Sequence, residues 1–181
     1  MRTTLLLTAI GPDRTGLVES LARRISAAGA NWEESRLARL AGQFAGIVLV
    51  TVEAERADSL ITSLRELAAS GLQITSQPVT PPATAPTGER VELHITGADR
   101  PGIVHDVARI LAEHDINVDE LESSIGSAPM SGEAMFEAHA LLLVPPTVSL
   151  AGLRSALEVL GNELMVDLGP EPTPPLEQRN Q

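Results

Sequence analysis

A short motif, Asp-Arg-x-Gly, occurs twice in the sequence, each time directly before a stretch with helical periodicity. The two copies are Asp13-Arg14-Thr15-Gly16 and Asp99-Arg100-Pro101-Gly102. The glycine of each copy permits a positive φ and lets a ligand approach the backbone closely. The helix that follows begins with unpaired N–H groups and the positive end of its dipole, which together attract an anion. The motif is therefore suited to hold a small anion at the start of each helix.

An asparagine follows each copy of the motif at the same spacing. Asn31 and Asn117 each stand 15 residues after the motif glycine, where the next predicted strand begins. The side-chain amide of asparagine offers both a hydrogen-bond donor and an acceptor. Together with the loop, it adds a second kind of polar group that a small zwitterionic ligand would need.

Each of these residues also has a purely structural interpretation. Aspartate is a preferred helix N-cap, and for Asp13 and Asp99 we favour capping over ligand contact. Pro101 is typical of a first helical turn, and the glycines suit a tight turn without any ligand. The arginines fit a solvated or ion-paired surface role, which contributes little to stability, and the asparagines suit the end of a helix. Only the joint recurrence of the whole set favours binding.

Histidines and acidic runs give weaker signals. His105 and His114 are nine residues apart on one predicted helix, half a turn out of phase, so they cannot share a metal ion. His94 and His139 lie on strands that we expect to be neighbours, but no clear Asp/His/Glu cluster accompanies them, so we expect a sheet-face role and no metal site. The run Asp119-Glu120-Leu121-Glu122 lacks the spacing and the glycine of a calcium loop and indicates a solvated strand edge.

Motifs for catalysis and for cofactor binding are missing from the sequence. The chain contains no Cys, which excludes disulfides, thiolate metal sites and a cysteine nucleophile. There is no Walker loop, no Gly-x-Gly-x-x-Gly and no Gly-x-Ser-x-Gly. No spacing sets a nucleophile beside a base. We therefore expect a protein that is not an enzyme and has no cofactor.

The two motif copies belong to an internal repeat. With the chain shifted by 86 residues, ten of the 28 positions from Leu7 to Glu34 are identical to their counterparts. Further along, Phe44 matches Phe136 at an offset of 92. The second half therefore carries six extra residues, most simply within the segment Gly126–Gly132, which we expect to be a hairpin loop rather than a lid.

Hydrophobic periodicity predicts the same elements in each half. Val91, Leu93 and Ile95 alternate with polar residues, as in a half-buried strand, and its counterpart is Thr3–Ala9. Apolar residues at helical spacing follow, namely Val18, Leu21, Ala22 and Ile25, and Val104, Val107, Ala108 and Leu111. The later predicted elements are strands at about 44–52 and 135–144, helices at about 56–69 and 149–160, and strands at about 72–79 and 164–168.

The resulting order is β-α-β-β-α-β, the ferredoxin-like unit of the α+β class, with an antiparallel sheet and both helices on one face. We predict a first domain at residues 1–77, a Pro-rich linker at 78–88, a second domain at 89–168 and a disordered tail at 169–181. Leu6 is out of phase with its neighbours and should point away from the helices.

A strand, Asp-Arg-Pro-Gly, a helix, Asn and a second strand within such a unit resemble the ACT domain family. The resemblance covers about residues 3–168, and the first half departs from it at Thr15, where proline is usual. It implies that a small, glycine-like amino acid binds between two paired domains, at this loop and this strand. The implied ligand-binding residues are Asp13, Arg14, Gly16 and Asn31 in the first half and Asp99, Arg100, Gly102 and Asn117 in the second.

The resemblance also implies a non-catalytic regulatory protein that contacts a transcriptional regulator protein, with its domains paired within one chain or in a homodimer. An alternative remains open at this point. The domains would then form a constitutive protein–protein adaptor without a ligand, in which the acidic second half docks a basic partner.

Charge and hydropathy further limit the classes of partner that the protein can bind. The formal net charge is -11. Residues 1–88 hold eight Arg and eight acidic residues, whereas residues 89–181 hold five Arg and sixteen acidic residues. This distribution argues against direct nucleic-acid binding, because phosphate affinity comes largely from clustered Lys and Arg. Neither a signal peptide nor an apolar run of membrane-spanning length is present, so we expect no membrane association and a cytoplasmic location.

Overall fold

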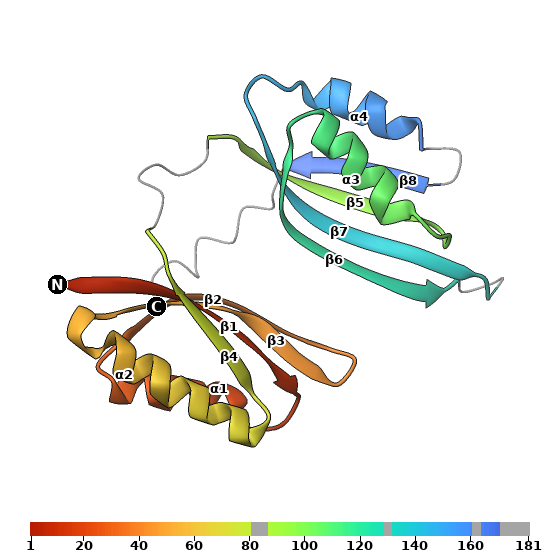
Figure 1. Ribbon diagram of the computed structural model, residues 1–181. Helices are drawn as coiled ribbons and strands as arrows, with labels where there is room; N and C mark the ends of the chain where they lie inside the picture. The colour runs from red at the N-terminus through yellow and green to blue at the C-terminus, as the bar shows by residue number, and fades with distance from the viewer. Residues whose placement is uncertain (81–86, 129–131, 161–163, 171–181) are drawn as a thin grey trace, which may run out of the picture. The chain divides into compact units, whose positions relative to one another are not determined.

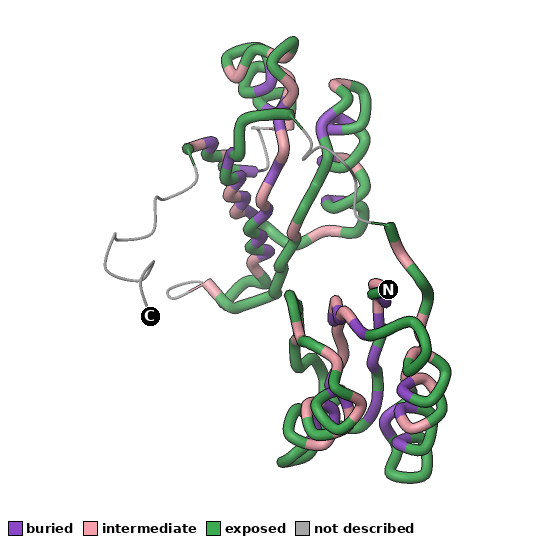
Figure 2. The backbone as a smooth tube through the Cα atoms, turned by 90° about the vertical axis from the view of Figure 1, so that its left-hand side faces the viewer, coloured by how far each residue is buried: buried purple, intermediate pink, exposed green. Residues whose placement is uncertain are grey.

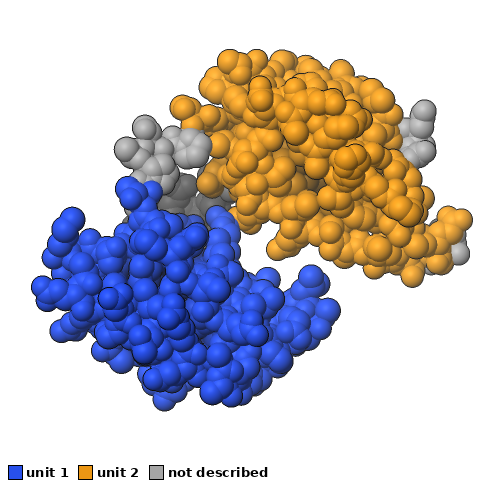
Figure 3. Space-filling view, viewed as in Figure 1, with its two compact units in different colours: residues 1–84 blue, residues 85–181 orange. Residues whose placement is uncertain are grey.

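The computed structural model describes residues 1–80, 87–128, 132–160 and 164–170. The chain divides into two compact units, residues 1–84 and 85–181, which are coloured separately in Figure 3. The predicted linker falls largely on residues 81–86 and most of the predicted tail on residues 171–181, and both segments lie outside the described residues. Each unit is considered by itself below.

Both units contain the same succession of strands and helices (Figure 1). The first unit consists of β1 (Arg2–Pro12), α1 (Leu17–Ala27), β2 (Asn31–Leu40), β3 (Gln43–Glu53), α2 (Ala54–Arg65), the 3-10 helix η1 (Glu66–Ser70) and β4 (Gln73–Pro78). The second unit consists of β5 (Glu89–Ala98), α3 (Ile103–Glu113), β6 (Asn117–Ser127), β7 (Ala134–Val144), α4 (Leu150–Glu158) and β8 (Leu164–Pro170).

Each unit has a four-stranded antiparallel sheet with both helices on one face (Figure 1). The strand orders are β2-β3-β1-β4 and β6-β7-β5-β8, so β2 and β6 occupy equivalent edges. The predicted α+β, ferredoxin-like fold is confirmed. The opposite face of each sheet carries no helix of its own unit and is called the open face below.

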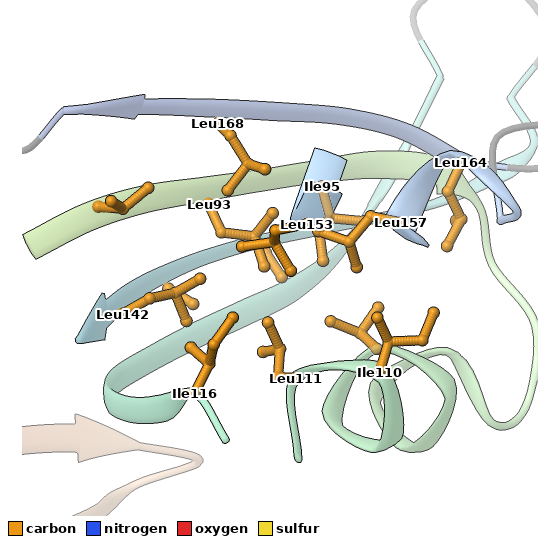
Figure 4. Close-up of a cluster of buried hydrophobic side chains, with 14 of the residues drawn as sticks. Leu93, Ile95, Ile110, Leu111, Ile116, Leu142, Leu153, Leu157, Leu164 and Leu168 are labelled. Carbon is orange, nitrogen blue, oxygen red and sulfur yellow. The ribbon is translucent and has the colours of Figure 1, made fainter. Parts of the chain in front are cut away.

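The core of each unit lies between its sheet and its helices, and the alternation of buried and exposed residues along the strands is visible in Figure 2. Leu5 and Leu7 of β1 are buried, whereas Leu6 between them lies on the open face, as predicted. In the second unit the sheet contributes Leu93, Ile95 and Leu142. These side chains meet leucines and isoleucines of α3 and α4 (Figure 4).

The apolar stripe of the first helix in each unit differs from the prediction. Val18 and Val104 are 46% and 45% exposed, whereas the preceding residues Leu17 and Ile103 are buried. The reason is the glycine before each helix, whose left-handed conformation directs the first helical residue into the core. The stripe therefore begins one residue earlier than the sequence periodicity indicated.

Strand pairing shifts two predicted boundaries, the start of the tail and the start of the linker, and the strand bounds locate the predicted insertion. The tail was expected from Gly169, but β8 continues to Pro170, because Gly169 and Pro170 pair with Glu92 and Val91 of β5. Pro78, which was assigned to the linker, is the last residue of β4 and pairs with Leu5. β6 ends at Ser127 and β7 begins at Ala134, so the six extra residues predicted for the second half fall between these two strands, and residues 129–131 of this segment lie outside the described residues.

Candidate functional site

The Asp-Arg-x-Gly motifs form the loops β1–α1 and β5–α3. The Asp13 N–H donates to the Gly42 carbonyl at 2.9 Å, and the Asp99 N–H donates to the Ala134 carbonyl at the same distance. These hydrogen bonds connect the first loop to the turn between β2 and β3, and the second loop to the first residue of β7. Gly16 and Gly102 follow as the N-cap residues, with φ of 88° and 93°. This left-handed conformation is one that glycine adopts readily and other residues adopt at a cost.

The expectation that Asp13 and Asp99 cap the helices is wrong. The cap positions belong to the glycines three residues later, and neither cap has a side-chain hydrogen bond. Asp13 instead forms an ion pair with Arg39 of β2 at 3.3 Å. A methyl group built on Gly16 would meet nothing within 4 Å. Within the described part of the chain, no side-chain cap therefore accepts from the first N–H groups of α1 and α3, and space lies beside the cap of α1.

The arginines of the two loops have different environments. Arg14 is exposed and forms no ion pair with the described residues. Arg100 is half-buried, pairs with Asp106 in the first turn of α3 at 2.9 Å, and donates to the Pro101 carbonyl at 3.3 Å. The counterpart of Asp106 in the first unit is Ser20, which carries no charge. The guanidinium of the first loop is thus uncommitted, whereas that of the second is engaged.

Each asparagine opens an edge strand and contacts an acidic residue two positions later. The Asn117 Nδ2 donates to Asp119 Oδ1 at 2.8 Å. In the first unit, hydrogen bonds from the Thr51 hydroxyl, at 2.5 Å, and from the Asn31 side chain lower the pKa of Glu33. Both acidic residues fall where the pairing register shifts, so each occupies a β-bulge.

The asparagines do not terminate the helices. Gly29 (φ 67°) and Asp115 (φ 54°) do so in the left-handed conformation. The Ala30 N–H donates to the Ile25 carbonyl and the Ile116 N–H to the Leu111 carbonyl, which closes both helix ends. The alternative interpretation of the asparagines as helix-ending residues is therefore wrong, and their polar side chains remain at the strand edges.

The loop and the asparagine lie at opposite ends of the same sheet. Pro12, next to the first loop, pairs with Gln43 at one end of β3, whereas Asn31 pairs with Thr51 near the other end. Eight residues of extended strand separate these partners, about 26 Å at about 3.3 Å per residue. The second unit repeats this spacing, with Met135 opposite Ala98 and Leu143 opposite Asn117. One unit alone therefore does not gather its four predicted residues around one small ligand.

A group of side chains that the sequence did not reveal lies on the open face of the second sheet. Glu137 stands beside His94 and His139, so the expectation that no Asp/His/Glu cluster accompanies these histidines is wrong. In the sequence, His94 is 43 positions from Glu137 and 45 positions from His139, and a single residue separates Glu137 from His139. Only the pairing register of β5 and β7 brings the three side chains together. The alternation of β7 was the only available signal, since it places Glu137 and His139 on the same face.

Comparison with known proteins gives a consistent family assignment. Models of the ACT domain match residues 3–76 and residues 91–139. The chain is 29% identical over 162 residues to the glycine cleavage system transcriptional repressor of Escherichia coli (strain K12). The aligned region covers 88% of this chain and 85% of that protein. The protein of the same description from Shigella flexneri matches to the same extent.

Solved structures resemble the chain over nearly its whole length. A protein from Galdieria sulphuraria, described only as unknown, has a TM-score of 0.82 and 29% identity, covering 94% of this chain and 99% of that one. A structure provisionally assigned as a glycine cleavage system transcriptional repressor has a TM-score of 0.71 and 20% identity, covering 93% and 97%. Within the described residues, no helix is long and apolar enough to cross a membrane.

Proposed function

Because the chain belongs to the ACT-domain family and carries two ACT domains in tandem, we propose that it is a non-catalytic regulatory protein that senses a small amino acid, with glycine as the first ligand to test. Homology to a glycine cleavage system transcriptional repressor supports a regulatory, ligand-sensing role. The observation that carries the proposal is the pair of helix N-termini that have no side-chain cap and begin at a left-handed glycine.

We propose that the ligand carboxylate binds at the start of α1. The uncapped N–H groups and the helix dipole attract an anion there, and the exposed guanidinium of Arg14 adds a positive charge within the same loop. Arg100 is already paired with Asp106, so a carboxylate at the second loop has to compete with that aspartate. We therefore assign the stronger site to the first loop.

A second ACT domain completes the site. Asn31 lies about 26 Å from its own loop along the sheet, at about 3.3 Å per residue, so it cannot contact a ligand held there. The edge strand β2 has Asn31 at one end and, at the other, Arg39, which pairs with Asp13 of the loop. If two such edges align antiparallel, the loop of one domain meets the asparagine of the other. The asparagine amide then bonds the ligand's amino or carboxylate group.

Occupancy of such a shared site favours the paired arrangement of the domains, because a ligand shifts an equilibrium toward the state that binds it better. The paired and unpaired arrangements expose different surfaces to a protein partner. Given the name of the Escherichia coli relative, the proposed partner is a transcriptional regulator. Regulation then takes place through protein–protein contact and not through DNA.

Thermal unfolding against a panel of free amino acids tests the proposal. A specific ligand at 100 times its dissociation constant stabilises the fold by about 2.7 kcal/mol, so the unfolding midpoint should rise by several degrees. Asn31→Ala and Arg14→Ala should each abolish most of the rise. Gln73→Ala, which removes a side-chain amide from the opposite edge strand β4, is the matched control and should leave it intact.

Two results would contradict this function. The first is the absence of any shift across the panel, and the second is a shift that persists unchanged in the Asn31→Ala and Arg14→Ala variants. If a partner is captured in a salt-sensitive manner that no amino acid changes, the chain is instead a constitutive adaptor that uses its acidic second unit.

A further inference from the structure

We propose that the open face of the second ACT domain holds a binding site for a divalent transition-metal ion, formed by His94, Glu137 and His139. One ligand-type atom from each of these residues lies within 4.8 Å of the others. No second group of this kind occurs among residues 1–80, 87–128, 132–160 and 164–170. The site does not depend on the proposed amino-acid sensing, because it lies on the sheet face and not at the β5–α3 loop.

Strand register builds the site. His94 of β5 and His139 of β7 are directly opposite each other on neighbouring antiparallel strands. Side chains in such a pair have Cβ atoms about 4.5–5.5 Å apart and point to the same face. Glu137 precedes His139 by two residues, so its side chain emerges on that face as well. The two middle strands of the sheet therefore supply all three groups.

The three side chains already converge on one point. Nε2 of His94 lies 3.2 Å and Nε2 of His139 lies 3.6 Å from the same carboxylate oxygen, Oε1 of Glu137. The imidazole rings are stacked, with centroids 4.1 Å apart and an interplanar angle of 14°. To bind a common ion, the two ring planes must tilt toward each other. Both rings are partly exposed, with 42% and 63% of their side-chain surface accessible, so neighbouring atoms leave room for this rotation.

The donor set selects the class of ion. Two imidazole nitrogens and one carboxylate oxygen suit zinc and the other first-row divalent metals, and they suit magnesium and calcium poorly because those ions prefer oxygen ligands alone. Zinc commonly takes three protein ligands and one water. Glu122 of the edge strand β6 is directly opposite His139 and is the nearest candidate in the register for a fourth ligand.

The surroundings favour a cation. The two histidines line a hollow of about 470 Å³, whose acidic lining residues are Glu92, Glu120, Glu122 and Asp167. Arg154 approaches Asp167 only to 3.9 Å. A concave surface lined by one sign of charge raises the local concentration of the opposite ion. The acidic lining therefore attracts a metal cation toward the site before the three ligands coordinate it.

The first ACT domain provides an internal contrast. The residues equivalent to His94, Glu137 and His139 are Thr8, Ala45 and Ile47, none of which carries an imidazole or a carboxylate. Arg36 pairs with Ile47 in the first unit, just as Glu122 pairs with His139 in the second. The proposed fourth ligand is thus replaced by a cation in the first unit. The same fold therefore forms without these ligands, so the three residues are not required to build the sheet.

Calorimetric titration of zinc chloride into the full chain tests the site. The protein should carry no affinity-tag histidines and should first be treated with a chelator and dialysed. We expect one zinc ion per chain. His94→Ala and His139→Ala should each weaken binding by at least about tenfold, since losing even an outer-shell partner of a metal ligand costs 10–100-fold. His105→Ala removes an exposed histidine of α3 in the same domain and should bind zinc like the parent chain.

The absence of zinc binding by the parent chain would overturn the proposal, as would equal binding by the His94→Ala/His139→Ala double variant. Thermal unfolding without metal verifies that each variant is folded, which we expect because the replaced side chains are exposed. If a variant does not fold, Glu137→Gln keeps the side-chain shape and removes the anionic ligand. Weaker zinc binding by Glu137→Gln supports the site, and unchanged binding refutes it. Amino-acid binding by the Glu137→Gln variant should equal that of the parent chain, which separates this test from that of the sensing function.

Discussion

Gly16 and Gly102 hold the entrance to their helices in a left-handed conformation, and the side chains nearest to them in the sequence do not cap those helices. The motif spacing identified the loops that begin α1 and α3, because it recurs in both halves. It did not identify the partners of the side chains. Asp13 pairs with Arg39, 26 positions away, and Arg100 pairs with Asp106, six positions away. The motif alone does not predict either partner.

Substitutions at the first loop separate the role of the glycine from that of the aspartate. Gly16→Ala should lower the free energy of unfolding by about 1 kcal/mol, because an alanine in the left-handed conformation costs about 1–2 kcal/mol and its methyl group meets no neighbour. Asp13→Ala should cost less than about 0.5 kcal/mol, the range of an exposed ion pair. Urea unfolding monitored by the fluorescence of Trp32, the single tryptophan, measures both.

A loss of about 1 kcal/mol in Asp13→Ala, the typical effect of removing an N-cap, would contradict this assignment. Arg39→Ala serves as the matched control, because it breaks the same ion pair from the other side. It should have the same small effect as Asp13→Ala.

At the scale of elements, the end of β1 passes very close to the chain between η1 and β4. A methyl group added to Gly11 would collide with the backbone carbonyl oxygen of Gly71. Gly11 is buried at the end of β1. The repeat conserves a glycine at the equivalent position, Gly97, and the structure supplies the packing reason in the first unit.

Gly11→Ala should destabilise the first unit by about 1–3 kcal/mol, the usual cost of overpacking, because the obstacle is backbone and cannot rotate away. Gly126→Ala is the control, since a methyl group there meets nothing within 4 Å and its backbone lies in strand β6. Its effect should stay within about 0.5 kcal/mol. Equal losses at the two positions, measured by chemical denaturation, would show that strand propensity and not close packing decides.

At the scale of the whole molecule, the two units have separate hydrophobic cores. The buried residues form two clusters, one within each unit, and Leu7 and Leu93 occupy equivalent central positions in them. The excess negative charge is confined to the second half, where Glu92, Glu122 and Glu137 replace Leu6, Arg36 and Ala45 of the first half. Part of the excess charge therefore distinguishes the open face of the second unit from that of the first.

Separate cores predict separate responses to mutation. Leu7→Ala should lower the stability of the first unit by about 2–5 kcal/mol, the range for a buried leucine. Leu93→Ala should have the same effect on the second unit. Trp32 fluorescence reports on the first unit alone, because no other tryptophan is present. Its unfolding transition should shift in Leu7→Ala and stay in place in Leu93→Ala, while circular dichroism detects both. A fluorescence transition that shifts in Leu93→Ala would show that the two units unfold as one.

The sequence alone determined the repeat, the order of the elements, the fold class and the loops that begin each first helix. These features depend on local periodicity and on spacing, which are visible in any stretch of about ten to thirty residues. Leu6 was assigned to the open face for the same reason.

The tertiary structure alone decided which distant side chains meet. The register between β5 and β7 places His94, Glu137 and His139 together, and a shift of one residue would turn the side chains to opposite faces. The lengths of β1 and β3 keep Asn31 and the first loop apart, although the motif had grouped them. Both outcomes depend on the pairing of strands that are far apart in the sequence. The energy of that pairing is spread over a whole strand, so no single residue type reveals the register.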